Sequence, residues 1–290
     1  MKFILDILRG MVIGLANIIP GVSGGTMMVS MGIYDTLIHS ITHLFKEFKK
    51  SIMALLPFAI GMVVAIASLS FVITWAFDNY PLPTNTLFIG LILGGLPAII
   101  KQIKGEKVGA VGGILFVAFF ALIIVLQIIQ KENVTNITLS FGEMVKLLFL
   151  GALASATMVI PGVSGSMVLK LLGYYEPVIG SIKGLTSSLF AGEWSAVLSN
   201  VGILLPFGIG IVIGIFAIAK LIEVLIAKYK GWTYAAILGL VTASPVAILM
   251  ATDMSGISFV TVLVSLVTFA VGYAVAYVLS PKDDKKELKA

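Results

Sequence analysis

Two short stretches interrupt apolar sequence: Pro20-Gly21-Val22-Ser23-Gly24-Gly25 and, 141 positions later, Pro161-Gly162-Val163-Ser164-Gly165-Ser166. Proline removes a backbone donor and glycine frees the backbone, so neither stretch suits an unbroken helix. Apolar arms of about 15 to 20 residues flank each stretch and would reach about 22–30 Å as helices. Residues 3–41 and 145–182 are therefore predicted to form helical hairpins that enter the membrane and return, although full crossing by both arms also fits.

The composition indicates an integral membrane protein. Of 290 residues, 59% are hydrophobic and 11% are charged, and the mean hydropathy is +1.11. Soluble domains average about half apolar and about a quarter charged residues, so this excess argues against soluble enzymes, secreted scaffolds and nucleic-acid-binding domains. The absence of cysteine excludes disulfides and thiolate metal sites, and two histidines argue against a His-rich metal or haem site. We expect an all-α membrane protein without a cofactor.

Six further apolar runs have about the length that a membrane-spanning helix needs, which is about 20 residues. They cover residues 51–77, 84–100, 108–129, 197–227, 233–251 and 257–280. Lysines cluster in the loops at 46–50, 101–107 and 228–230 and in the tail at 282–290. If both hairpins return to their starting side, all these clusters fall on one side, which the positive-inside rule makes cytoplasmic. Both termini are then predicted to be cytoplasmic.

The second half of the chain repeats the first. At an offset of 141, identical residues include Gly10/Gly151, Pro20/Pro161, Ser23/Ser164, Gly32/Gly173 and Tyr34/Tyr175; at an offset of 149, Leu56-Pro57-Phe58 matches Leu205-Pro206-Phe207. Residues 1–140 and 141–281 each hold one re-entrant hairpin and three spans. Because three crossings is an odd number, the halves are predicted to have inverted topology. Inverted repeats with broken helices are typical of transporters whose binding site lies between the halves near the midplane; a duplication without transport is the alternative.

The two broken stretches offer chemistry for binding an anion. Non-helical backbone at membrane depth lines protein or water, and the N–H groups that begin the second arm carry the positive end of a helix dipole, which suits phosphate. Serine and threonine hydroxyls add donors. The candidate phosphate-binding residues are Asn17, Gly21, Ser23, Gly24, Gly25, Thr26, Gly162, Ser164, Gly165 and Ser166, with Lys170 and Arg9 as candidate cations.

Charged residues inside a membrane are costly and are functional candidates by default. Lys170 lies one helical turn beyond the second loop, where it meets either an anionic headgroup or Glu176. Arg9 follows Asp6 by three residues and either binds cargo, pairs with Asp6 or extends to the interface. Asp35 and Glu176 occupy equivalent repeat positions and are either surface groups at helix ends or proton carriers.

Isolated glycines at positions 10, 14, 32 and 173 are expected to allow close helix packing, because small residues let membrane helices approach. Gly21-Val22-Ser23-Gly24-Gly25 also fits the G-x-S-x-G nucleophile pattern. That pattern requires a strand–turn–helix and a histidine partner, and the second copy ends in Ser166. An intramembrane serine protease using Ser23 with His39 or His43 is kept as the weaker alternative.

The segments Ala16-Asn17-Ile18-Ile19-Pro20-Gly21-Val22-Ser23-Gly24-Gly25-Thr26 and Ile160-Pro161-Gly162-Val163-Ser164-Gly165-Ser166 resemble the paired signatures of the polyprenyl-phosphate transporters of the PopT type, formerly a domain of unknown function. The resemblance covers nearly the whole chain in length, repeat spacing and motif order. It implies a bacterial or archaeal plasma-membrane flippase, not an enzyme. Its partner would be undecaprenyl phosphate or a related lipid, moved from the outer to the inner leaflet for reuse in peptidoglycan and other envelope polymers. A transporter or channel for a small anion is the main alternative.

Overall fold

The computed structural model describes residues 2–18, 22–129 and 140–280, and every regular element in these ranges is an α-helix. The first half contains α1 (Lys2–Ile18), α2 (Gly24–Ser30), α3 (Tyr34–Thr42), α4 (Phe48–Asn79), α5 (Pro81–Ile103) and α6 (Gly109–Ile128). The second half contains α7 (Phe141–Val159), α8 (Gly165–Leu171), α9 (Tyr175–Ala191), α10 (Trp194–Ala251) and α11 (Phe259–Leu279). The predicted all-α class is confirmed.

Six of these helices, α4, α5, α6, α7, α10 and α11, are long and apolar enough to cross a membrane. The prediction of a multi-pass membrane protein is confirmed, although α7 had been assigned to a hairpin arm. Helix α10 covers two predicted spans, 197–227 and 233–251, without a loop between them. Its 58 residues would extend about 87 Å if straight, far beyond a hydrocarbon core of about 30 Å.

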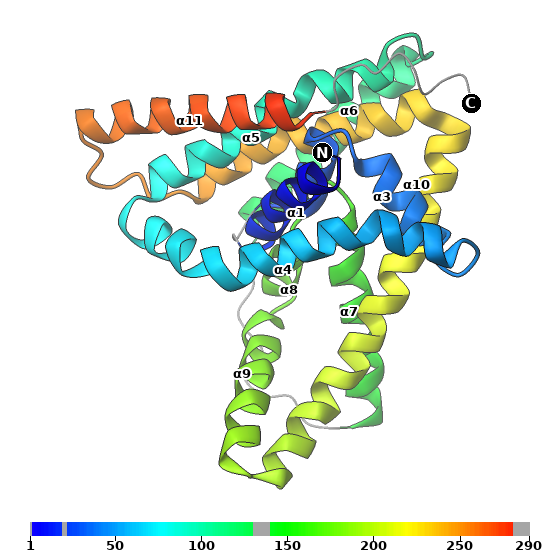
Figure 1. Ribbon diagram of the computed structural model, residues 1–290, viewed down its shortest axis with the longest axis vertical. Coiled ribbons are helices and arrows are strands. Elements are labelled where there is room, and N and C mark those ends of the chain that lie inside the picture. Colours follow the sequence, from blue (N-terminus) through cyan, green and yellow to red (C-terminus); the bar gives the residue numbers. More distant parts are fainter. Residues whose placement is uncertain (1, 19–21, 130–139, 281–290) are drawn as a thin grey trace.

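A bend at Tyr229 divides α10 into two segments. The backbone there is non-helical, with φ −137° and ψ 46°. In Figure 1 the first segment runs along the length of the molecule beside α7, and the second turns across it toward α11. The chain changes direction at this bend, where the sequence predicted a loop. The two segments of α10 therefore run in different directions.

The second arm of each hairpin is broken again, at Gly32 and Gly173. These glycines have φ values of 64° and 78°, in the left-handed region that closes helix C-termini. The N–H of Ile33 donates to the carbonyl of Met28 at 3.0 Å, and the same pattern follows α8. These two glycines end α2 and α8 after seven residues each, a role that the packing expectation did not include.

Glycines at positions 10 and 14 do bring helices together, as predicted. A methyl group on Gly10 would overlap the backbone of Phe58, so α1 and α4 approach closely at that point. Gly14 meets the backbone of Met62 one turn later. The repeat-equivalent Gly151 meets the backbone of Phe207 in the same way, which packs α7 against the first segment of α10.

The last helix of each half packs against the other half. Gly90 of α5 lies against the backbone of Phe269 in α11, and Gly239 of α10 lies against the backbone of Phe116 in α6. The two glycines are equivalent at the repeat offset of 149, since residue 90 corresponds to 239. Helix α11 of the second half thus packs against α5 of the first, and helix α6 of the first half packs against α10 of the second.

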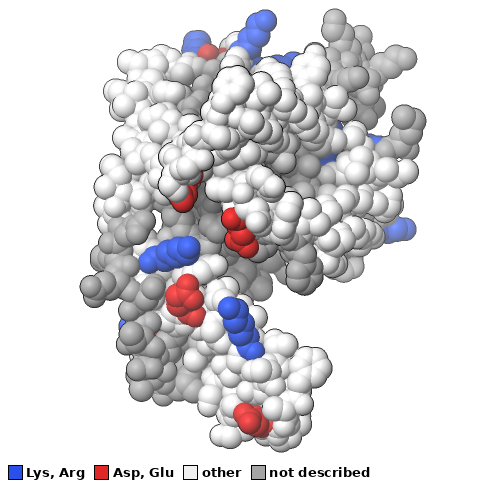
Figure 2. Space-filling model, turned by 90° about the vertical axis from the view of Figure 1, so that its left-hand side faces the viewer, with Lys and Arg blue, Asp and Glu red and all other residues white. Residues whose placement is uncertain are grey.

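The outer surface of the helices is rich in exposed apolar side chains. Ile114 and Val117 of α6 and Leu266 of α11 are each more than 60% exposed. Charged side chains are sparse on the face in Figure 2, most of which carries neither sign. An apolar surface of this extent fits contact with lipid acyl chains.

Candidate functional site

The broken regions of the two halves contact each other. The hydroxyl oxygen of Thr26, the third residue of α2, accepts a hydrogen bond from the backbone N–H of Gly162 at 2.7 Å. A methyl group on Gly25 would lie 2.8 Å from the carbonyl oxygen of Val159, so only glycine fits there. The hydroxyl of Tyr34 donates to the same carbonyl at 3.1 Å. The start of α2 is therefore seated on the loop between α7 and α8.

Three serine hydroxyls lie around this contact. Ser23 and Ser164 occupy the N-cap positions of α2 and α8, but neither side chain caps its helix. Ser23 instead donates to the carbonyl of Ile160 at 3.5 Å, the outer limit for a hydrogen bond, and Ser164 pairs with Ser166 at 2.7 Å. Both N-cap serines are buried beside the contact of Thr26 with Gly162, which we call the junction. Their hydroxyls make few hydrogen bonds that a ligand would have to replace.

The junction is chemically unequal in its two halves. The amide of Asn17 lies against Gly24, within 2.5 Å of where a methyl group on that glycine would stand. At the equivalent place in the second half, Met158 lies against Gly165. The first half thus presents an amide and the second a thioether. Gly21 falls outside the described residues.

The helices that begin at the junction are short. Helices α2 and α8 have seven residues each, whereas the sequence suggested arms of about 15 to 20 residues. The backbone N–H groups of a first turn have no intrahelical partner at any helix length. A short helix has fewer aligned peptide dipoles, so local N–H groups and hydroxyls matter more at this site than the sequence suggested.

Lys170 lies on the exposed side of α8. Its ammonium group stands 4.9 Å from the ring centre of Tyr175, a cation–π contact. It forms no ion pair with Glu176, although both residues are described. The interpretation that Lys170 neutralises Glu176 is therefore wrong, and its ammonium group is accessible to an anion.

Arg9 is buried in a network of its own. One terminal nitrogen pairs with the Asp6 carboxylate at 2.8 Å. The other terminal nitrogen and Nε donate to the backbone carbonyl of Leu279 at 2.8 and 2.9 Å. Of the alternatives for Arg9, the structure shows pairing with Asp6, and the guanidinium also binds the carbonyl end of α11.

Asp35 and Glu176, equivalent in the repeat, have different surroundings. The carboxylate of Asp35 accepts a hydrogen bond from the hydroxyl of Tyr234 at 2.6 Å, beside a cavity of about 10 Å³ that Gln102 also lines. Glu176 is exposed on α9. The sequence did not indicate that Tyr234 would be a partner of Asp35. Tyr234 lies far along the chain, in α10, and the equivalent position in the first half is Asn85, so the repeat does not single it out.

No hydrogen bond joins Ser23 to His39 or His43, all of which the structure describes. Both histidines contact Glu223 of α10 instead. Ser23 lies in a helical hairpin, whereas the nucleophile pattern requires a strand before its turn. The site therefore lacks the arrangement of a serine hydrolase.

Comparisons with known proteins identify the family of the chain. A family described as undecaprenyl phosphate translocase-like matches residues 13–258 and 185–287. The chain belongs to this family. The chain is 32% identical to a Staphylococcus aureus protein named polyprenyl-phosphate transporter, over 95% of both chains. It is 31% identical to a Vibrio cholerae protein of the same name, over 83% of this chain and 75% of that protein. No solved structure matches the chain.

Membership of the undecaprenyl phosphate translocase-like family makes the chain a transporter and not an enzyme. Thr26 and Gly162, which join the two halves, both lie within the matched residues 13–258. The serine protease alternative is therefore set aside.

Proposed function

We propose that this protein is a flippase that carries undecaprenyl phosphate, or a related polyprenyl phosphate, across the plasma membrane from the outer to the inner leaflet. There the lipid would be reused for peptidoglycan and other envelope polymers. The names of the family and of both relatives support the lipid class. One structural observation carries the site: the hydrogen bond between Thr26 and Gly162, which joins the two broken regions.

The two halves form an inverted-topology repeat in this proposal, 1–140 and 141–281, with the tail at 282–290. The equivalent glycine contacts support it: Gly10 on Phe58 matches Gly151 on Phe207, and helices α6 and α11, each of which packs against the other half, match each other. If the two halves are related by a symmetry axis, the polar junction where they meet lies on that axis. In transporters of this kind that axis lies near the bilayer midplane. The hairpins would enter from opposite faces and return.

Phosphate binds where the junction opens. In the closed arrangement Thr26 satisfies the N–H of Gly162, and the serine hydroxyls bond to each other or weakly to backbone. Separating the loops would free these donors, and a phosphate group could replace the lost partners with charge-assisted hydrogen bonds. The groups proposed to bind it are Asn17, Ser23, Thr26, Ser164 and Ser166, with the backbone at Gly21, Gly24, Gly25, Gly162 and Gly165.

Lys170 is proposed to attract the phosphate from the exposed end of α8 and is the cation of the site. Arg9 has its guanidinium occupied by Asp6 and Leu279, so we assign it a structural role. The polyprenyl tail stays in the bilayer, because the outer helices are apolar and need no enclosed tunnel for it. Rocking of the halves would expose the junction to each leaflet in turn.

Asp35 and Glu176 are the proposed proton carriers if transport is coupled to protons. Asp35 is the better candidate, since its carboxylate bonds to Tyr234 and so links α3 to α10. Protonation would weaken its acceptance of that hydrogen bond and loosen the link. In this proposal the basic loops at 46–50, 101–107 and 228–230 lie on one side and both termini are cytoplasmic, which the positive-inside rule supports.

Purified protein in proteoliposomes tests the proposal. Polyprenyl phosphate, labelled in the outer leaflet, should move to the inner leaflet in vesicles with protein and stay in protein-free vesicles. Entry of inorganic phosphate and chloride is measured in the same vesicles, because a small-anion transporter is the competing function. If the small anions enter and the lipid does not, the lipid proposal is wrong.

A further inference from the structure

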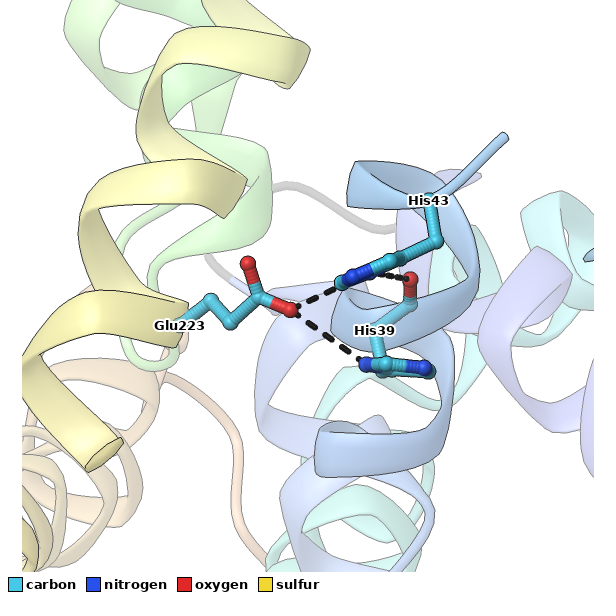
Figure 3. A group of neighbouring side chains, drawn as sticks. All are labelled: His39, His43 and Glu223. Atoms are coloured by element: carbon cyan, nitrogen blue, oxygen red, sulfur yellow. Dashed lines mark hydrogen bonds and ion pairs between the residues drawn. The ribbon is translucent and has the colours of Figure 1, made fainter. Parts of the chain in front are cut away.

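A cluster of His39, His43 and Glu223 joins α3 to the first segment of α10 (Figure 3). The histidines lie one turn apart on α3, and their rings stack with centres 4.0 Å apart. Nδ1 of each ring lies 3.3 Å from the same oxygen of Glu223, Oε1. Both Nδ1 atoms thus lie beside the same carboxylate oxygen of another helix.

Both acceptor positions of that oxygen are used, and the ring of His43 has hydrogen-bond partners elsewhere. The hydroxyl of Thr42 also donates to Oε1 of Glu223, at 2.9 Å. A carboxylate oxygen has two lone-pair sites, which Thr42 and His39 use here, while Nδ1 of His43 lies 3.1 Å from the backbone carbonyl of His39. One cation bound to both ring nitrogens and to the carboxylate would take the place of the two ring protons.

Neighbouring side chains hold the carboxylate in place. Thr42 bonds to Oε1, and the ammonium of Lys220 lies 2.6 Å from Oε2. Outer partners of this kind orient metal ligands. The Lys220 charge also opposes a second cation, which limits the affinity of the site.

We propose that His39, His43 and Glu223 bind a divalent transition-metal cation, with Zn²⁺ the best match. Histidines four residues apart on one helix face are a recurrent zinc-binding arrangement. Bonds of about 2.0–2.1 Å place tetrahedral ligand atoms about 3.3 Å apart, the separation already present between each Nδ1 and Oε1. All three candidate ligand atoms lie within 4.8 Å of one another, and rotation of the stacked rings would direct both ring nitrogens at one ion. Water would fill the fourth position.

The site would act as a clip between the two halves. Helix α3 belongs to the first hairpin and α10 to the second half, so a shared metal ion restrains their relative movement. The second half has Gly180 and Gly184 at the positions equivalent to the histidines, so only one such clip exists per chain. The sequence alone argued against a His-rich metal site because the chain has two histidines, and it did not indicate Glu223, which lies far along the chain from them.

Zn²⁺ binding to the full-length protein, purified with an affinity tag that contains no histidine, tests the site. Isothermal titration should give one Zn²⁺ per chain. His39→Ala and Glu223→Gln should each weaken binding at least about tenfold. Asp78→Asn is the control, because Asp78 is an exposed carboxylate in a different region, and it should leave the affinity unchanged.

A stability measurement separates loss of the site from loss of the fold. Zn²⁺ should raise the unfolding temperature of the wild type and of Asp78→Asn, because it binds only the folded state, but not that of the two site variants. If His39→Ala/Glu223→Gln binds Zn²⁺ as tightly as wild type, or wild type binds none at micromolar concentration, the proposal is wrong. This binding assay does not involve lipid transport, so its outcome leaves the proposed function untouched.

Discussion

The hydroxyl of Thr26 accepts a 2.7 Å hydrogen bond from the backbone N–H of Gly162, across 136 positions of sequence. Thr26 is fully buried, and Gly162 has a φ of 85°, a conformation that disfavours any side chain. The bond therefore joins two positions that tolerate little change. It has no counterpart with the halves exchanged, because the residue equivalent to Thr26 is Met167.

Replacing Thr26 by valine should destabilise the protein by about 1–3 kcal/mol, because valine keeps the shape but leaves a buried N–H unsatisfied. Thr26→Ser keeps the acceptor and loses one methyl group, so it should cost about 1 kcal/mol. Thermal unfolding in detergent measures both. Equal stability of wild type and Thr26→Val would contradict the role assigned to this bond.

Replacing Ser23 and Ser164 together by alanine should abolish polyprenyl phosphate exchange while leaving the protein folded. Hydrogen bonds to a charged group contribute about 1.5–3 kcal/mol each, so losing two predicts exchange at least about 100-fold slower. Their present bonds are weak or to another serine, so little stability is lost. Ser187→Ala, on the exposed part of α9, is the matched control. Unaltered exchange in the double variant would remove these hydroxyls from the site.

Gly10→Ala should destabilise the protein by about 1–3 kcal/mol, the usual cost of overpacking, because its methyl group would overlap the backbone of Phe58. Gly113→Ala is the matched control, since it lies inside α6 with nothing within 4 Å of the new methyl group. Alanine favours a helix over glycine by about 1 kcal/mol, so the control should be neutral or stabilising. Unfolding temperatures that change alike in both variants would contradict the packing role of Gly10.

The features that followed from local sequence were predicted, and those that depend on distant partners were not. Helix class, the apolar spans and the close packing at Gly10 follow from composition and periodicity. The left-handed ends at Gly32 and Gly173 were missed because the apolar pattern continues through them, and only the backbone reveals the break. The bend at Tyr229 was read as a loop for the opposite reason, since Lys228 and Lys230 interrupt the apolar pattern while the helix continues.

In the candidate site too, the features of local sequence were predicted and those that depend on distant partners were not. The sequence predicted that the two Pro-Gly-Val-Ser-Gly stretches matter, and the structure brings them into contact through Thr26 and Gly162. The sequence could not decide the role of Arg9, because one of its partners is the backbone carbonyl of Leu279, which no residue type in the sequence indicates. Tyr234 was missed for a related reason: its hydroxyl meets Asp35 only after α10 bends back over α3.

Arg9→Met should destabilise the protein by about 3–5 kcal/mol, because it leaves Asp6 buried without its partner. Arg9→Met with Asp6→Leu should recover much of that loss, since both members of the pair are then apolar. Arg9→Lys should not rescue, because a single ammonium cannot reproduce the fork that binds Asp6 and the Leu279 carbonyl together. If the folded double variant loses lipid exchange, Arg9 acts on the phosphate and the structural assignment fails.

Asp35→Asn should make polyprenyl phosphate exchange independent of pH if Asp35 carries the coupling proton, because an amide cannot titrate. Exchange is measured across a range of pH, equal on both sides of the vesicle membrane, and the slopes of wild type and variant are compared. Tyr234→Phe removes the donor of the 2.6 Å bond but keeps the carboxylate, so exchange by this variant should still depend on pH. Glu176→Gln is the repeat-equivalent control: this exposed residue lacks such a partner, and its variant should keep the wild-type slope. A flat profile for Glu176→Gln with an unchanged one for Asp35→Asn would reverse the assignment between the two carboxylates.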